Sequence, residues 1–333
     1  MTSPAPFRPI RLAGHRLRAE ILPFGASLVS LVPDGLGRSI VLGHGNREDY
    51  AKHPKLYMGA VIGRHANRIA FGRTLLDGQT LKLDLNAPPH HSAGGAAGFS
   101  TQTFRVGLRT RERVALHYHS PDGEGGYPGA LDVSVTYELA PPSTLRLTLE
   151  ATTTAPTILS MCHHPYFDLD GRRDVRDHEL QVHAERYLPC DDTVLPTGDV
   201  VPVKGTGFDF RTARRFASAP GWARLNNTFR LHDMPEGPLR PAATLWGADG
   251  TRLDLATTMP GLHVYSGHRL SGTAHGADGQ QFEAFSGLCL EAQAWPDAPN
   301  NPLFPSVVLR PERGYRHVTE YRIGLQNEAR RAG

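Results

Sequence analysis

The sequence predicts an all-β protein, a large antiparallel β-sandwich with few short helices. Apolar and polar residues alternate with period two in several segments, the mark of strands with one buried face. The 35 glycines and 27 prolines are spread between short apolar segments, as turns between strands require. No repeat of 20–50 residues and no shift in composition divides the chain. We therefore expect one domain over residues 1–333.

The clearest alternation lies in three consecutive segments, 114–119, 131–138 and 145–150. Each places apolar side chains such as leucine and valine at every second position. Turn sequences separate the segments, namely PDG at 121–123 and PP at 141–142. The short link between the last two segments predicts that they pair as antiparallel neighbours.

Further strands are expected at shorter apolar runs along the rest of the chain. These runs are residues 158–161, 180–183, 243–246, 262–265, 287–291 and 318–323. Helical signals are weak, and the best candidate is a segment of at most two turns at residues 47–52. These expectations complete a mostly β protein.

Charge and cysteine content narrow the functional classes. The chain has 36 Lys and Arg against 33 Asp and Glu, a net charge of +3, and no run of five like charges. Nucleic acid and anionic membranes are therefore not expected partners. Three cysteines, Cys162, Cys190 and Cys289, form no paired framework, and the N-terminus lacks an apolar secretory core. We expect a cytoplasmic protein with reduced thiols.

Four stretches combine ionisable residues with glycine, proline and aromatic residues. They are GRHANR at 63–68, HHSAGG at 90–95, CHHPYF at 162–167 and EAQAWPD at 291–297. None of them is a strong motif by itself. Nucleotide-binding glycine motifs and the GxSxG motif of acyl transfer are absent from the sequence.

The pair His163 and His164 follows an apolar run and precedes a proline. Neighbouring residues on a strand point to opposite faces, so one ring should enter the interior of the sandwich while the other leaves it. A structural, hydrogen-bonded histidine and a functional one are about equally plausible from the residues alone. A catalytic role requires a carboxylate partner.

Glu291 supplies such a carboxylate at the end of an apolar run. A carboxylate there is either exposed at the rim or retained for function, because burying it unpaired is costly. Metal binding is the main competitor, given 17 histidines. Adjacent histidines on strands diverge, however, and no zinc-type spacing is present, so we expect no metal and no cofactor.

Aromatic residues accompany these polar groups. Tyr166, Phe167 and Trp295 lie in the four stretches, and Tyr265 lies in the predicted strand at 262–265. Sugars offer apolar C–H faces and a ring of hydroxyls, so aromatic rings beside polar side chains suit a sugar site. The residues leave the ordinary alternative, aromatic core packing, open.

The four stretches together resemble the aldose 1-epimerase family, the galactose mutarotases. The segment GRHANRIA at 63–70 is similar to the family's G-R-x-A-N-R-I, and HPYFDL at 164–169 to its N-H-S-Y-F-N-L. The segment LEAQAWPDAPN at 290–300 resembles L-E-T-Q-x-F-P-D-A-P-N and is the most specific of the three. The similarity extends from about residue 20 to about residue 323.

The resemblance implies a β-supersandwich that interconverts sugar anomers. Glu291 matches the base that takes the proton of the anomeric hydroxyl, and His164 matches the acid that protonates the ring oxygen. Asn67 and Arg68 match substrate-binding positions, and Gln293 lies on the same segment as the base.

Two positions depart from the family pattern. Ala93 stands where the family has a substrate-binding histidine before Gly-Gly, and we expect His90 or His91 to reach that place only through a rearranged loop. Asn226 stands where the family has a substrate-binding aspartate, and an amide binds a hydroxyl without charge. The preferred sugar is therefore left open.

The leading hypothesis is an isomerase, a mutarotase of a free small-molecule sugar that works without a cofactor, as a monomer or homodimer. One alternative is an epimerase of a phosphorylated or otherwise derivatised sugar, to which Arg64 or Arg224 could contribute positive charge. Another is a non-catalytic sugar-binding or regulatory protein of the same fold. The changes at Ala93 and Asn226 favour this last alternative, and retention of Glu291 and His164 opposes it.

Overall fold

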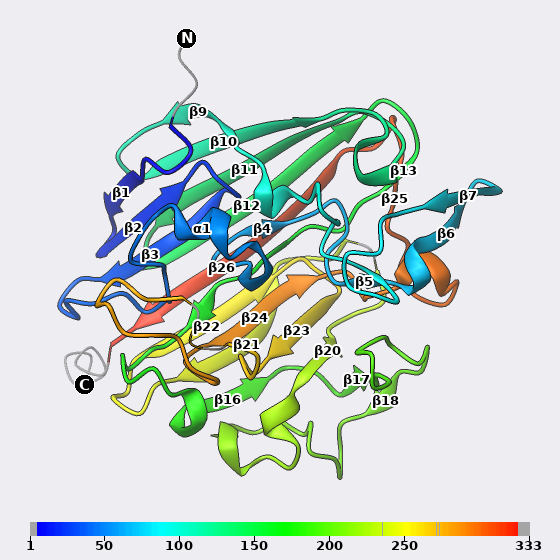
Figure 1. The fold of residues 1–333 in the computed structure, drawn as a ribbon. Helices are drawn as coiled ribbons and strands as arrows, with labels where there is room; N and C mark the ends of the chain where they lie inside the picture. The colour runs from blue at the N-terminus through cyan, green and yellow to red at the C-terminus, as the bar shows by residue number, and fades with distance from the viewer. Residues whose placement is uncertain (1–4, 235, 271, 273, 326–333) are drawn as a thin grey trace.

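A computed structural model describes residues 5–234, 236–270, 272 and 274–325. Strands dominate the described chain and form two large antiparallel sheets with several smaller ones around them (Figure 1). The prediction of an all-β sandwich with few helices is confirmed. The described part of the chain contains no helix long and apolar enough to cross a membrane.

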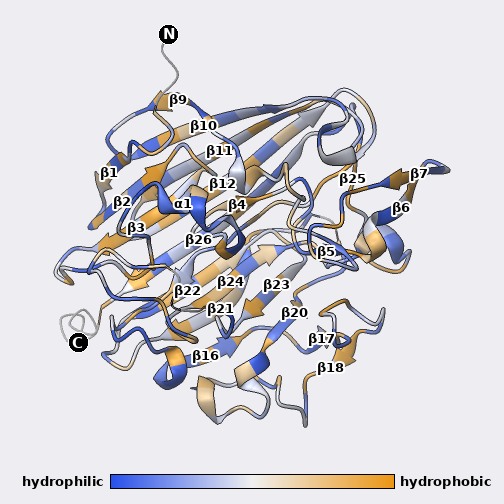
Figure 2. Ribbon diagram, viewed as in Figure 1, coloured by the Kyte–Doolittle hydropathy of each residue, from blue (hydrophilic) through white to orange (hydrophobic). Residues whose placement is uncertain are grey.

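The larger sheet has nine strands in the order β19-β16-β21-β22-β26-β12-β11-β10-β9. The three alternating segments of the sequence are its strands β10, β11 and β12, which pair as antiparallel neighbours as predicted. Apolar and polar residues alternate along them (Figure 2). The bounds are β9 Arg105–Arg109, β10 Arg113–Ser120, β11 Leu131–Ala140, β12 Thr144–Thr153, β16 Glu179–Val182, β19 Arg214–Arg215, β21 Arg240–Trp246, β22 Arg252–Thr257 and β26 Tyr315–Gly324.

The second sheet has six strands in the order β15-β24-β23-β20-β17-β18. All six residues of β24 are buried, in contrast to the alternating strands of the larger sheet. Glu291 lies within β24 rather than at the end of its strand, which corrects the expectation from the sequence. The bounds are β15 Tyr166–Phe167, β17 Arg186–Leu188, β18 Val201–Pro202, β20 Asn226–Arg230, β23 Gly261–Tyr265 and β24 Leu288–Gln293.

Shorter elements surround the two sheets. Strands β1, β2 and β3 form a three-stranded sheet, and the pairs β4–β14, β5–β8, β6–β7 and β13–β25 are two-stranded. Their bounds are β1 Ile10–Gly14, β2 Leu17–Leu22, β3 Ser27–Pro33, β4 Val61–Ile62, β5 Arg68–Ile69, β6 Arg73–Leu76, β7 Gln79–Lys82, β8 His91–Ser92, β13 Thr157–Ile158, β14 Cys162–His163 and β25 Val308–Leu309.

Helices are few and short. The predicted helix is the single turn α1, Asp49–Lys52, which confirms a short helix in that segment. The remaining helical turns are 3₁₀ helices at Pro54–Leu56, Ala70–Gly72, Phe99–Thr101, Glu124–Gly126, Val175–Asp177, Phe216–Ser218, Trp222–Arg224 and Ala298–Asn300.

The main core lies between the two large sheets. Leu147 of β12 and Leu255 of β22 belong to the same buried cluster as Leu262 of β23 and Leu290 of β24. Burying a leucine stabilises the fold by roughly 1.5–3 kcal/mol, so this interface fixes the position of β24. Glu291 is one of the six buried residues of β24.

Candidate active site

Glu291 and His164 come together across the junction of β24 and the short strands β14 and β15. His164 lies between these two strands, and β15 pairs with β24 so that Tyr166 faces Cys289. The His164 backbone is held by hydrogen bonds with Ala60 and Gly59. As a result, His164 Nε2 lies 3.5 Å from Glu291 Oε1. The sequence placed these two residues 127 positions apart, and the fold makes them neighbours.

The neighbouring His163 points to the opposite side. Its ring nitrogens lie 3.2 Å from the Tyr137 hydroxyl and 3.1 Å from the Tyr321 hydroxyl, on strands β11 and β26 of the larger sheet. The prediction that the two rings diverge is confirmed. His163 is a satisfied core histidine, whereas His164 faces a carboxylate.

Tyrosines and thiols enclose the pair. Ring centroids of Tyr166, Tyr57 and Tyr265 lie 5.1, 5.7 and 6.4 Å from that of His164. Cys162 donates its thiol hydrogen to Glu291 Oε2 over 3.5 Å, and Cys289 Sγ lies 3.6 Å from His164 Nδ1. The side chains of His164 and Glu291 keep 11% and 7% of their surface exposed, so the pair is nearly but not completely buried.

Burial drives both groups of the pair toward their neutral forms. It raises the pKa of Glu291 to about 8, an effect partly opposed by the Cys162 hydrogen bond. It also lowers the pKa of His164 to about 4. Between a pH of about 4 and about 8 the two groups therefore share one titratable proton. A carboxylate beside an imidazolium also holds one such proton, so moving it from Glu291 to His164 converts one state into the other. Such a pair contains one proton donor and one acceptor across a wide pH range.

A second histidine lies beside Glu291 on the next strand. His263 of β23 is in register with Glu291, and its other neighbour across the sheet is Thr228 of β20. His263 Nε2 lies 2.7 Å from Asn226 Oδ1, and its Nδ1 lies 2.9 Å from Thr228 Oγ1. Asn67 reaches the same ring with its amide nitrogen at 3.5 Å. The fold therefore brings Asn67 and Asn226 together around His263.

Arg68 and Gln293 occupy different environments near this group. Burial lowers the pKa of His263 and raises that of Tyr57, and the positive charge of the nearby Arg68 acts to lower the pKa of both groups. Gln293 is completely buried, and neither its amide nitrogen nor its amide oxygen has a hydrogen-bond partner among the described residues. Buried amides are normally paired, so Gln293 is suited to bind a ligand or a water molecule.

His90 and His91 are engaged in their own loop. The His90 ring accepts from the Phe71 N–H and contacts Thr193, and the His91 ring contacts Asp84 and Tyr127. In the described chain no contact joins either ring to His164 or Glu291. Ala93 itself packs among Ala60, Ala66 and Cys162, so small side chains fill the place where the family has a histidine.

Several residues of the site could not be singled out in the sequence. His263 and Tyr57 carry no motif, although a histidine in the apolar run GLHVY of β23 was a usable signal for a buried polar group. Conversely, two aromatic residues noted in the sequence belong to the core. Trp295 donates to the Pro260 carbonyl and packs on Phe304, and Phe167 packs on Tyr321.

Two clusters in the described chain combine metal-ligand residue types. One is His164, Cys289 and Glu291 of the candidate pair, and the other is Asp168, Asp170 and His178. In the second, His178 Nε2 accepts the Leu169 N–H, which leaves the hydrogen of the neutral ring on Nδ1. That ring then offers no free lone pair to a metal.

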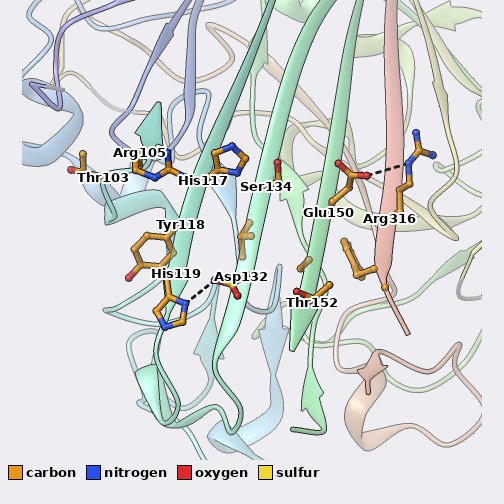
Figure 3. A pocket seen from close by; sticks show the side chains of 14 residues that line it. Thr103, Arg105, His117, Tyr118, His119, Asp132, Ser134, Glu150, Thr152 and Arg316 are labelled. Atoms are coloured by element: carbon orange, nitrogen blue, oxygen red, sulfur yellow. Dashed lines mark hydrogen bonds and ion pairs between the residues drawn. The ribbon is translucent and has the colours of Figure 1, made fainter. Parts of the chain in front are cut away.

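A surface hollow lies elsewhere. It has a volume of about 760 Å³ and lies over strands β9 to β12 and β26, on the nine-stranded sheet (Figure 3). Two ion pairs lie in its lining, His119 with Asp132 at 2.8 Å and Arg316 with Glu150 at 3.4 Å. None of the predicted site residues lines it. This hollow is therefore not the candidate active site.

Comparison with known proteins identifies the same family along nearly the whole chain. The aldose 1-epimerase family model matches residues 9–322. The chain is 38% identical to the galactose mutarotase of Homo sapiens over 95% of its length and 93% of that protein. It is 34% identical to the aldose 1-epimerase of Escherichia coli K12, covering 96% of this chain and 95% of the relative.

Solved structures of similar proteins have the same fold as this chain. A GalM/aldose epimerase homologue from C. elegans superposes with a TM-score of 0.89 at 30% identity, covering 96% of this chain and 99% of that one. A galactose 1-epimerase from Lactobacillus acidophilus gives a TM-score of 0.82 at 28% identity, with 95% and 94% coverage. The family resemblance and the fold inferred from the sequence are both confirmed.

Proposed function

Because this chain belongs to the aldose 1-epimerase family, we propose that it is an isomerase that interconverts the α and β anomers of a free sugar. Glu291 and His164 are the proposed base and acid. The observation that supports these roles is the 3.5 Å approach of His164 Nε2 to Glu291 Oε1 inside a nearly buried site.

Ring opening of a cyclic hemiacetal needs two proton transfers at oxygens on the same carbon. Transfer of the pair's proton from Glu291 to His164 first gives a carboxylate and an imidazolium. Glu291 then takes the proton of the anomeric hydroxyl while His164 gives its proton to the ring oxygen, and the C1–O5 bond breaks to leave an aldehyde. Rotation about C1–C2 then presents the other face of the carbonyl. Reclosure runs the transfers in reverse, with His164 as base and Glu291 as acid. Each positioned group contributes roughly 10²–10⁴-fold.

The protonation state of the buried pair suits this exchange of roles. Opening and reclosure each use one donor and one acceptor, and the pair holds one proton from a pH of about 4 to about 8. Substrate oxygens that enter between the two groups complete the proton path, so no cofactor is required for the reaction.

The proposed sugar contacts are Asn67, Arg68, Asn226 and Gln293. The first three surround His263 beside the pair, and the last is a buried amide in need of a partner. His90 and His91 remain proposals for substrate contact only if their loop rearranges, because their rings are already bonded.

An epimerase of a phosphorylated or otherwise derivatised sugar is the second candidate function. Arg64, one of the two arginines considered for it, is not available. Its guanidinium is buried and donates to Ser120 Oγ and to the backbone carbonyls of Ser120, Pro121 and Gly129. A non-catalytic role has less support, because the acid–base pair is preserved.

We also propose a cytoplasmic monomer or homodimer that acts on a small molecule rather than on nucleic acid or membranes. Free thiols at Cys162, Cys190 and Cys289 support a reducing compartment. The near balance of charges, +3 overall, supports the absence of polyanionic partners.

Polarimetry on freshly dissolved single anomers tests the proposed function. α-D-Glucose, α-D-galactose and further aldoses and ketoses are followed with and without protein, before and after dialysis against EDTA. We expect faster relaxation for at least one sugar and no effect of EDTA. A rate equal to that of buffer for every free and derivatised sugar would contradict the proposed function, and loss of activity after dialysis would contradict the metal-free mechanism.

A further inference from the structure

Two cysteines stand two residues before the proposed acid and base. Cys162 precedes His164 in this way, and Cys289 precedes Glu291 within strand β24. Residues two apart on a strand point to the same face of the sheet, so Cys289 and Glu291 share a face. Both thiols are free and buried. The same local spacing therefore places a sulfur near each of the two proposed catalytic groups.

The two thiols contact the pair crosswise. Cys289 Sγ lies 3.6 Å from His164 Nδ1, whereas Cys162 donates to Glu291 Oε2 over 3.5 Å. His164 Nε2 in turn lies 3.5 Å from Glu291 Oε1. One ligand atom from each of Cys289, His164 and Glu291 lies within 4.8 Å of the other two. These three side chains therefore surround a space in which one small ion can contact them all.

The ligand types favour a soft or borderline divalent cation. Thiolate sulfur and imidazole nitrogen are ligands of Zn²⁺, whereas Mg²⁺ and Ca²⁺ take oxygen ligands. In a tetrahedral zinc site the metal–ligand bonds place neighbouring ligand atoms roughly 3.3–3.8 Å apart. The contacts of His164 with Cys289, 3.6 Å, and with Glu291, 3.5 Å, fall within this range. The geometry therefore requires only small side-chain shifts to hold zinc.

Cys162 supports the carboxylate in this arrangement. Its thiol bonds Oε2 of Glu291, which leaves Oε1, the oxygen beside His164, for an ion. Hydrogen bonds from outside the ligand set orient ligating carboxylates in metal sites. Three protein ligands leave the fourth position of a tetrahedral ion open to water or another small molecule.

The third cysteine provides an internal contrast. Cys190 is half-buried, and within the described residues its thiol hydrogen bond goes to the Leu188 carbonyl at 3.8 Å. A thiol with such a partner is typical of an inert small side chain. Cys289 differs because its sulfur meets the ring of an ionisable residue.

From these contacts we infer that His164, Cys289 and Glu291 form an inhibitory site for Zn²⁺ or a similarly soft divalent cation. On binding, the thiol hydrogen of Cys289 and the proton shared by Glu291 and His164 leave to solvent as H⁺. The ion then occupies the nitrogen and oxygen atoms that would exchange protons with a sugar. It is an inhibitor, not a cofactor. The inference goes beyond the proposed function, and only the inhibition rests on that function.

Cobalt spectroscopy tests binding without turnover. Co²⁺ takes the same ligands as Zn²⁺, and its thiolate charge-transfer absorption in the near ultraviolet reports a bound sulfur. We expect this band in the metal-free wild type after Co²⁺ is added, with loss of the band when Zn²⁺ displaces the cobalt. Cys289→Ala and Cys289→Ser should lack the band, whereas Cys190→Ala, the matched thiol control, should keep it. A wild type without the band, or a band that persists in both Cys289 variants, would overturn the inference.

Inhibition is measured by NMR exchange of sugar anomers in the presence of Zn²⁺. We expect Zn²⁺ to suppress turnover by the wild type, EDTA to restore it, and Mg²⁺ at the same concentration to have no effect. In Cys289→Ala the Zn²⁺ concentration for half-inhibition should rise by at least about tenfold, since loss of groups that hold a metal weakens binding roughly 10–100-fold. Cys190→Ala should keep the wild-type value. Equal Zn²⁺ sensitivity of Cys289→Ala and the wild type would contradict the inference.

The two measurements separate failure of the inference from failure of the proposed function. If the wild type turns over no sugar, a cobalt band that depends on Cys289 still supports the metal site. If the wild type is an active mutarotase but shows neither the band nor inhibition by Zn²⁺, the metal site is refuted and the proposed function stands.

Discussion

His163, the last residue of β14, and His164, which follows it, are buried in opposite chemical settings. Toward the nine-stranded sheet, His163 lies between the hydroxyls of Tyr137 and Tyr321. Toward the six-stranded sheet, His164 meets the carboxylate of Glu291 and the thiol of Cys289. Both rings are buried, and burial lowers the pKa of each, to about 3 and about 4 respectively.

This difference shows that burial and a perturbed pKa do not by themselves mark a catalytic histidine. His163 is satisfied by neutral partners that have no proton to exchange at neutral pH. His164 faces a carboxyl group whose pKa is raised to about 8, so a proton can pass between them or to a bound sugar. The partner, rather than the ring, distinguishes the catalytic histidine from the structural one.

Loss of the carboxylate should have the largest effect. We expect Glu291→Gln to lower kcat by at least about 10²-fold, since general acid–base groups contribute roughly 10²–10⁴-fold, while sugar affinity changes little. Single-turnover NMR and calorimetry measure the two quantities. Asp168→Asn, an isosteric change at another buried carboxylate, is the matched control and should keep its turnover. Wild-type kcat in Glu291→Gln would refute the base assignment.

Substituting the two histidines one at a time should separate a catalytic role from a structural one. His164→Asn should lower kcat by about 10²-fold or more with a smaller change in the melting temperature. His163→Leu should instead cost about 1–3 kcal/mol of unfolding free energy, with kcat nearly retained. The buried Tyr321 hydroxyl loses its partner, and the Tyr137 hydroxyl keeps only the Ala26 carbonyl. Denaturant unfolding measures the loss of stability in both variants, and steady-state kinetics measures kcat and KM. A rise in KM alone in His164→Asn would make His164 a binding residue.

The pH profile should show where the pair stops holding one proton. Below a pH of about 4, His164 takes up a second proton and no base remains. Above a pH of about 8, Glu291 loses its proton beside a neutral ring and no acid remains. We therefore expect kcat/KM to be bell-shaped with a broad maximum near neutrality. A profile that keeps rising through pH 9 would conflict with this state of the pair.

The smallest effect is expected from the thiol beside Glu291. Cys162 donates to Glu291 Oε2, which favours the carboxylate and lowers its pKa. Cys162→Ala removes that bond, so the alkaline limb of the profile should move to higher pH while kcat at neutral pH changes less than about tenfold. A loss of activity as large as in Glu291→Gln would instead assign Cys162 a direct role in the chemistry.

The regular part of the fold was predictable from sequence because it depends on local periodicity. Strands β10, β11 and β12 alternate over eight to ten residues each and were placed correctly. The end of β24 was not, because its residues are buried on both faces and the period-two signal is lost. The divergence of His163 and His164 followed from strand geometry alone.

The site was only partly predictable, because it depends on contacts between distant segments. The family resemblance supplied Glu291 and His164, and the structure adds their geometry. His263 was missed because its importance lies in its register opposite Glu291 and its bonds to Thr228 and Asn226, which no local pattern shows. Arg64 looked available in sequence, but buried backbone carbonyls use its guanidinium.

The coupling between Glu291 and His164 is tested most directly by a double-variant cycle in single-anomer relaxation. If the two residues act as one proton-exchanging unit, Glu291→Gln/His164→Asn will be about as slow as the slower single variant, because removing either group already disables the pair. Independent losses that multiply, with the double variant slower than the slower single variant by the full effect of the other, would show that the two groups do not work as a pair.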